Sequence, residues 1–178
     1  MKKINSKRKL ALVLVLCGVA LFGVTAYAIT TVQIAKGTIA HYEPFNGPAE
    51  VAIRKNTFQP GDTGPWHYHP GPVYVILTAG TVTVMEGCGD VKQYSAGDAF
   101  YEPAGGVHQV TNQGTVPAEF YTTGIVPVGQ PTRIVVEGPR CGPPTGTQQC
   151  KDSGWMKFDF PRVFENQGDC VSFVNTGK

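Results

Sequence analysis

The pattern of apolar and polar positions predicts a series of short strands between Ile29 and Val128. Thr81–Glu86 (TVTVME) alternates with period two, and Gly87-Cys88-Gly89-Asp90 follows it as a hairpin-type turn signal. The strands that the pattern predicts lie at residues 73–77, 81–86, 91–94 and 118–122. Beyond the first 28 residues, no segment shows a helical period with caps. Evenly spaced strands separated by turn residues are typical of an all-β sandwich or barrel.

The first 28 residues have a different pattern. A basic start precedes an apolar run from Leu10 to Val24, and Ala26-Tyr27-Ala28 has the small-x-small form of a signal-peptidase site. We therefore predict a signal peptide over 1–28, cleaved after Ala28, and a secreted, periplasmic or extracellular protein. The apolar run is shorter than the roughly 20 residues that span a bilayer, so an uncleaved membrane anchor is the alternative.

Removing this leader changes the charge. It holds five of the 15 basic residues and none of the 13 acidic ones, so the formal charge of +2 becomes −3. The remaining basic residues are scattered, which argues against nucleic-acid binding. After cleavage no stable membrane span is expected.

Export also changes how the cysteines are interpreted. Cys17 lies in the leader after Leu16, where a lipidation site needs a small residue. The other four cysteines are an even number without a C-x-x-C pair, which favours two disulfides over a thiolate zinc site. Four cysteines allow three pairings.

The composition changes again after residue 137. Residues 138–149 are rich in proline and glycine and predict a linker after a barrel of residues 29–137. Residues 150–178 are dense in aromatic side chains, which indicates a small packed unit that needs a staple. This favours Cys150 paired with Cys170, which leaves Cys88 with Cys141.

Three histidines are the candidates for chemistry. His67 and His69 stand two residues apart at a strand end, so their side chains leave the same face. His108 follows some 40 residues later and would arrive from an adjacent strand. Neutral imidazoles bind iron, zinc, manganese, nickel or copper, and the sequence does not distinguish among these ions. His41 lies outside this group and is interpreted as exposed or hydrogen-bonded.

The spacing around these histidines resembles the two motifs of the cupin superfamily. The first is Gly61, five residues, His67, one, His69, three, Val73, six and Gly80; the second is Gly97, five, Pro103, one, Gly105, two, His108, three and Asn112. Sixteen residues separate the motifs, close to the spacing of small single-domain microbial cupins. The resemblance covers roughly residues 40–128.

This resemblance implies a small antiparallel, jelly-roll-like cupin β-barrel that holds one divalent metal ion. His67, His69 and His108 match the histidine ligands of the family, whereas Val73 stands where the family has a glutamate. The resemblance also implies a turn at Gly97-Asp98 and a loop shaped by Pro103 and Gly105.

The missing glutamate leaves the charge of the ion uncompensated and its coordination positions open. We therefore expect an anionic or enolisable substrate to supply the negative ligand. Among residues that could replace the glutamate, Tyr74 alternates to the opposite face from Val73. Glu86 and Glu102 are the nearest glutamates, with no spacing argument for either.

Other side chains near the motifs are candidates for contact with a ligand. The predicted contacts are Trp66, Tyr74, Phe100 and Asn112. The alternative for the aromatic residues, and for Tyr68 and Tyr101, is packing in the barrel core. Asn112 could instead satisfy backbone groups in a turn.

The end of the chain has a separate resemblance. The segments 150–155 and 164–173 are similar to a short cysteine-paired segment that ends many exported bacterial proteins, with Ser153 in place of a usual glycine. This resemblance suggests a role at the surface or in stability.

Two functions from different classes fit these observations. One is a three-histidine, metal-dependent oxygenase similar to cupin dioxygenases, with a small-molecule substrate. The other is a module that binds a small acid or sugar without turnover, since no clear acid, base or nucleophile accompanies the histidines. A third class, an interaction protein, rests on the cysteine-paired end, and its partner would be a second copy or a cell-surface component.

Overall fold

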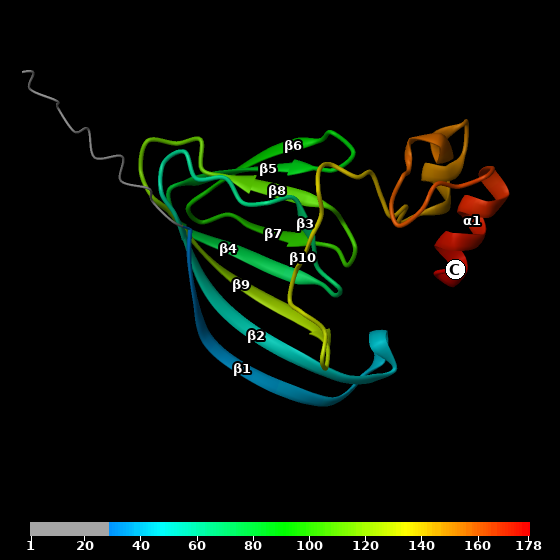
Figure 1. The fold of residues 1–178 in the computed structure, drawn as a ribbon. Helices are drawn as coiled ribbons and strands as arrows, with labels where there is room; N and C mark the ends of the chain where they lie inside the picture. The colour runs from blue at the N-terminus through cyan, green and yellow to red at the C-terminus, as the bar shows by residue number, and fades with distance from the viewer. Residues whose placement is uncertain (1–28) are drawn as a thin grey trace, which may run out of the picture.

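The computed structural model describes residues 29–178 as two facing antiparallel sheets followed by a small C-terminal unit (Figure 1). The predicted signal peptide lies outside these residues. The first sheet contains β1 (Thr30–Tyr42), β2 (Gly47–Phe58), β4 (Val73–Ala79), β7 (Ala99–Glu102) and β9 (Ala118–Pro127). The second contains β3 (His67–Tyr68), β5 (Thr81–Glu86), β6 (Val91–Ser95), β8 (His108–Thr111) and β10 (Ile134–Val135).

The order of the strands places the two cupin-like motifs on both sheets. The first sheet runs β1-β2-β9-β4-β7 and the second runs β10-β3-β8-β5-β6. Neighbours in each sheet are antiparallel. The predicted all-β barrel is therefore confirmed, with His67 and His108 on neighbouring strands.

The core lies between the sheets and follows the alternation in the sequence. In β4, Val73, Val75 and Leu77 are buried, whereas Tyr74 and Ile76 are about half exposed. Inward-facing side chains from both sheets form one cluster: Phe58, Val73, Val75, Leu77, Val82, Val84, Val110, Ala118 and Phe120. Burying such side chains contributes roughly 1.5–3 kcal/mol each and holds the two sheets together.

The predicted strands agree with the structure best where the turns are tight. β5 has the predicted bounds, and the backbone N–H groups of Glu86 and Gly89 donate to Asp90 and Glu86 within the hairpin turn. By contrast, β1 and β2 are longer than the predicted short strands. Because β1 is exposed along almost its whole length, it shows no burial pattern that the sequence could reveal.

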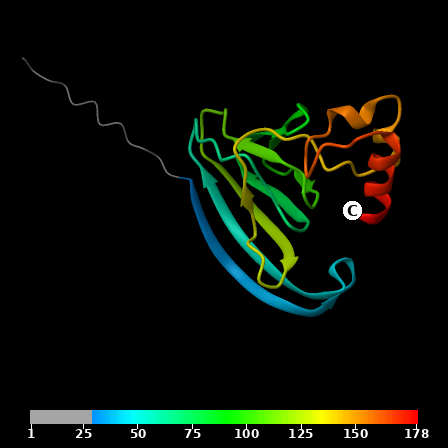
Figure 2. The same ribbon diagram turned by 45° about the vertical axis from the view of Figure 1, so that its right-hand side comes forward.

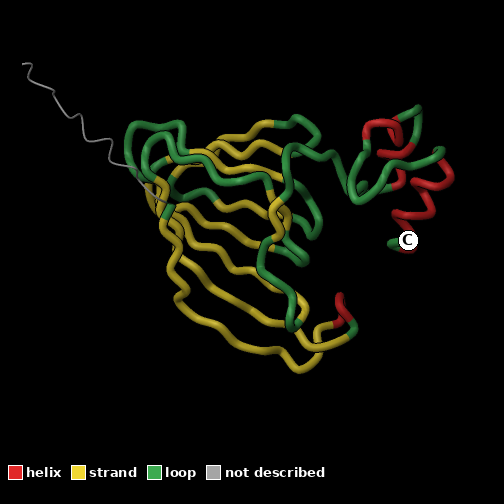
Figure 3. The backbone as a smooth tube through the Cα atoms, viewed as in Figure 1, coloured by secondary structure: helices red, strands yellow, loops and turns green. Residues whose placement is uncertain are grey.

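The expectation that no helix follows the leader was wrong. Figure 3 shows helical turns at η1 (Glu43–Phe45) and after β10, and α1 (Gln167–Thr176) is a regular α-helix. Asn166 caps its first turn by accepting from the Asp169 N–H, and Gly177 ends it in the left-handed region. Within residues 29–178, no helix is long and apolar enough to cross a membrane.

The C-terminal unit lies at one end of the barrel, beside the β5–β6 turn (Figure 2). Both favoured disulfides are confirmed, because Cys88 is bonded to Cys141 and Cys150 to Cys170. The second pair belongs to a separate small core with Phe158 and Phe164. Besides α1, the unit contains η2 (Thr147–Cys150) and η3 (Gly154–Lys157).

Candidate metal centre

Three histidine rings converge inside the barrel. His67 in β3 lies directly opposite His108 in β8, and His69 follows β3 by one residue. Their ring centroids are 4.4–5.3 Å apart, and one nitrogen from each ring lies within 4.8 Å of the others. His67 and His108 are buried, with 8% and 2% of their surface exposed. The predicted convergence of the two motifs is therefore present.

Hydrogen bonds fix the same nitrogen in all three rings. The Nδ1 atoms of His67, His69 and His108 lie 2.9, 2.5 and 3.0 Å from the backbone carbonyl oxygens of Pro65, Thr132 and Gly106. A carbonyl oxygen only accepts, so each Nδ1 must donate. In the neutral rings, every Nε2 then keeps its lone pair. Metal-ligating histidines are oriented in this way in proteins.

A carboxylate that the sequence did not assign completes the cluster. Glu102 Oε2 lies 3.2 Å from His69 Nε2, and Glu102 Oε1 lies 3.2 Å from His108 Nε2. The Glu102 side chain is only 7% exposed. Glu102 therefore adds an anionic oxygen donor to three imidazoles, the hard and intermediate ligands that divalent transition metals accept.

The register of the first sheet explains where this carboxylate comes from. Val73 in β4 pairs directly with Glu102 in β7, so both side chains leave the same face and enter the barrel. The glutamate that the first motif lacks is thus supplied from the facing position on the adjacent strand. Glu86 is opposite His108 in the β5–β8 pair but makes no hydrogen bond or ion pair with the described histidines.

The proton affinities of these groups reflect burial and mutual contact. Burial, together with the nearby His108, lowers the pKa of His67 to about 4. Burial alone would raise the pKa of Glu102, but its contacts with His108 and His69 outweigh this and hold that pKa well below its usual range. Burial likewise opposes the charged form of His108, yet contact with Glu102 raises its pKa overall. The carboxylate is therefore ionised inside the barrel.

One buried nitrogen tests whether a cation fits here. Within residues 29–178, His108 Nε2 has no hydrogen bond of acceptable geometry, although Glu102 Oε1 is 3.2 Å away. A lone pair facing a carboxylate oxygen is repelled unless a positive charge lies between them. A proton or a metal ion satisfies both atoms, so the donor set fits a divalent ion.

Tight backbone contacts hold the loops that carry these residues. The N–H of Gly105, in the loop before β8, donates to the His69 carbonyl at 2.8 Å, which joins the two motifs. A Cβ at Gly71 would lie 1.9 Å from the Ile125 carbonyl oxygen, so only glycine fits between His69 and β4. The predicted turn at Gly97-Asp98 is confirmed, with Gly97 in the left-handed region and Asp98 bonded to Ser95.

A cavity of about 280 Å³ leads to this cluster. His67, His69 and Glu102 line it together with Arg54 from β2 and the exposed Arg133 before β10. The remaining wall is largely apolar. The volume of the cavity corresponds to about nine water molecules, at about 30 Å³ each, so the cavity suits a small ligand.

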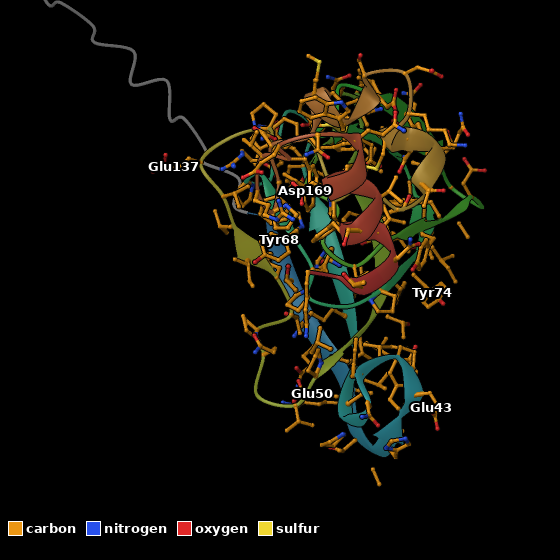
Figure 4. The ribbon with its side chains drawn as sticks, turned by 90° about the vertical axis from the view of Figure 1, so that its right-hand side faces the viewer. Glu43, Glu50, Tyr68, Tyr74, Glu137 and Asp169 are labelled. Carbon is orange, nitrogen blue, oxygen red and sulfur yellow. A yellow bond between two sulfur atoms is a disulfide. The ribbon has the colours of Figure 1, made fainter. Side chains whose placement is uncertain are left out.

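The four predicted ligand contacts do not line this cavity. Tyr74 alternates with the inward Val73, contacts the tilted ring of Tyr101 outside the barrel and stands at the outer edge of the molecule in Figure 4. Phe100 packs against the core and Tyr94. The Trp66 side chain is partly buried away from the cavity wall.

Asn112 takes the structural role that was its alternative. It is fully buried, and its amide donates to the carbonyls of Phe58 and Val116. His41, which was predicted to be exposed or hydrogen-bonded, contacts Glu43 at the surface.

Comparison with known proteins finds one matching family model and several similar structures. Residues 55–124 match the family model described as the cupin domain. No curated protein matches the chain. Among solved structures, a conserved protein with a double-stranded β-helix domain from Klebsiella pneumoniae is 19% identical, with a TM-score of 0.48 over 61% of this chain and 84% of that one.

Two further structures show the same kind of likeness. A cupin 2 conserved barrel protein from Salinispora arenicola is 21% identical, with a TM-score of 0.43 over 56% of this chain and 76% of that one. A cupin domain from Bordetella pertussis is 20% identical, with a TM-score of 0.44 over 56% and 94%. The part of this chain that matches the cupin domain, residues 55–124, contains the three histidines of the cluster and lies within the two facing sheets.

Proposed function

We propose that this protein is an exported cupin that holds one divalent metal ion through His67, His69, His108 and Glu102 and acts as an oxygenase on a small anionic or enolisable molecule. The observation that carries the proposal is the shared tautomer. Three Nδ1–H groups are fixed by backbone carbonyls, so three Nε2 atoms and one carboxylate converge in a buried site. Two disulfides support export, because they persist in oxidising compartments.

The groups around the cavity favour an oxygenase over acid–base chemistry. Of its titratable lining residues, the two histidines and Glu102 are committed to the cluster, and the two arginines keep their protons. No described lining residue is thus left to shuttle protons. When bound, a divalent transition metal supplies Lewis acidity and, for redox-active ions, reactivity with dioxygen. The protein's part is to orient the ligands, exclude water and bind the substrate.

The same observation supports a second candidate, a module that binds a small acid or sugar without turnover. The lack of a general acid or base among the described lining residues is as compatible with binding alone as it is with an oxygenase. In that case the metal ion only anchors the ligand.

Elemental analysis of protein matured in an oxidising compartment tests the metal site. We expect about one divalent ion per chain in the wild type and in His41→Ala, whose histidine lies at the surface. His67→Ala and His108→Ala should each lose the ion, because both remove a ligand and leave the others incomplete. Equal metal content in all four proteins would refute the site.

Oxygen uptake by the same proteins separates the two candidates. With a panel of enolisable and phenolic compounds, an oxygenase consumes dioxygen in the wild type and His41→Ala but not in His108→Ala. Metal retention with no uptake for any compound would instead support the binding module.

A further inference from the structure

The cavity wall carries a charged group that has no partner. Arg54 is half-buried in β2 and lines the same cavity as the histidines and Glu102. Within residues 29–178 its side chain makes no hydrogen bond, ion pair or ring contact, whereas Arg140 and Arg162 both pair with aspartates. A guanidinium has five N–H donors, and leaving them unsatisfied away from water costs free energy. Arg54 is therefore placed to meet a charge that the chain itself does not provide.

The register of the sheet aims Arg54 toward the centre of the barrel. It lies between the buried Ala52 and Asn56 on the inward face of β2 and pairs with Thr122 of β9, which also lines the cavity. Neighbouring inward positions in a strand lie about 6.6 Å apart. Ala52 is the neighbouring inward position. It begins a row of paired, inward-facing residues that crosses the sheet to β7, the strand that carries Glu102.

Small residues keep the space between Arg54 and the cluster open. The adjacent row runs from Ala52 through Gly124 and Val73 to Glu102. A Cβ built on Gly124 would contact only Val73, at 3.6 Å, so the wall is empty at this point. A ligand can therefore reach from Arg54 along this row to the histidines.

Three of the other polar side chains on this wall contact one another. Thr31 donates to Asn56 at 2.8 Å, and the Asn56 amide lies 3.4 Å from the Thr122 hydroxyl. Arg133 is exposed at the rim. Of the two cations that line the cavity, Arg54 is thus the half-buried one, and its guanidinium has no charged partner among the described residues.

We infer that Arg54 binds a carboxylate group of the ligand whose other end reaches the metal centre; this inference rests on the proposed function. The fork of a guanidinium matches the two oxygens of a carboxylate, and one such group balances one charge. The apolar side chains Phe58, Val110 and Phe120 line the same cavity and suit a short carbon skeleton. A phosphate dianion carries a second negative charge, for which this wall offers only the exposed Arg133 at its rim.

Calorimetric titration of the zinc-loaded protein with malonate tests this assignment. We expect Arg54→Gln to weaken malonate binding at least about tenfold, or about 1.4 kcal/mol, and Arg54→Lys to restore part of it. Arg133→Gln, the matched loss of a charge at the rim, should change the affinity less than about twofold. Malonamide, which has the same skeleton without charge, should bind Arg54→Gln and the wild type equally.

Several results would overturn the inference. They are an unchanged affinity in Arg54→Gln, an equal loss in Arg133→Gln, tighter binding of inorganic phosphate than of malonate, or no malonate binding by the wild type. Thermal unfolding and zinc content of each variant show that fold and centre are intact. If the wild type holds no metal, the proposed function fails, while the dependence of malonate binding on Arg54 in the metal-free protein still decides this inference.

Discussion

The pair formed by Val73 and Glu102 shows that a metal-binding carboxylate can come from either of two neighbouring strands and still lie at the same site. The two residues face each other across β4 and β7, and directly opposed Cβ atoms in antiparallel strands are about 4.5–5.5 Å apart. A glutamate at either position can therefore reach the same histidines. Both positions are buried, at 3% and 6% exposure, so whichever residue is not a ligand must be apolar.

Exchanging these two residues tests the idea. Glu102→Val should weaken zinc binding at least about tenfold, because it removes the anionic donor and leaves two histidine nitrogens without it. The double variant Val73→Glu/Glu102→Val should recover most of the affinity. Competition with a chelator measures both.

Glu86→Gln is the control for this exchange, since Glu86 is the other glutamate close to His108 but makes no ion pair there. It should bind zinc like the wild type. A double variant no better than Glu102→Val would show that the carboxylate must come from β7.

The sequence predicted some residues of the metal centre and not others. His67, His69 and His108 follow from motif spacing, which is local along the chain. Glu102 does not, because its role depends on which residue of β4 it faces, and pairing register is a property of the assembled sheet. Arg54 lies before the first motif on a strand whose alternation had not been identified.

At the scale of elements, α1 depends on one carboxylate. Arg162 donates through Nη1 and Nη2 to the two oxygens of Asp169, each at 2.8 Å, and the Glu165 N–H donates to the same group. The Arg162 contact, then the Glu165 N–H, lowers the pKa of Asp169 to about 2 from its ordinary value of 3.8. These contacts join the segment before α1 to its first turn.

This shift predicts acid sensitivity of the C-terminal unit. Because the folded pKa is below the unfolded one, the stabilisation from Asp169 is complete above about pH 4 and is lost as the pH falls through about 2. The melting temperature of the C-terminal unit should therefore fall between about pH 4 and pH 2. Fluorescence of Trp155, in a Trp66→Phe background, measures it. Asp169→Asn should flatten this dependence, and an unchanged acid response in that variant would contradict the assignment.

Elements were predictable where burial alternates and turns are tight, as in β5 and its hairpin. β1 gave no such signal because both of its faces are exposed. The helix α1 was missed because it is short and buries only Cys170. The residues that could have predicted this helix are its caps, Asn166 and Gly177, which stand at its observed ends.

Across the molecule, the two disulfides constrain different parts of the chain. Cys150–Cys170 closes a separation of 20 residues inside the C-terminal unit, whereas Cys88–Cys141 joins the β5–β6 turn to the linker across 53. The unit and the barrel have separate cores. We therefore expect Cys150–Cys170 to stabilise the C-terminal unit itself and Cys88–Cys141 to attach that unit to the barrel.

Replacing Cys150 and Cys170 together with serine tests this separation. Loss of the loop constraint should destabilise the C-terminal unit by about 3 kcal/mol, so limited proteolysis should remove the chain after the linker. The barrel should keep its metal, because its ligands are in the other core. Cys88→Ser/Cys141→Ser is the matched comparison; because Cys141 also packs against the C-terminal core, we expect this unit to be less resistant than in the wild type but more resistant than without Cys150–Cys170. Metal loss in the Cys150 and Cys170 variant would show that the two parts are coupled.

The carbonyl of Thr132, which orients His69, has a consequence for where this domain ends. The region that matches the cupin domain stops at residue 124, yet Thr132 lies beyond it, and Arg54 falls one residue before its start at 55. A fragment of residues 55–124 would keep His67, His69 and His108 but lose the Thr132 carbonyl that fixes His69 and the Arg54 side chain that lines the cavity. Residues outside the matched region therefore take part in building this site.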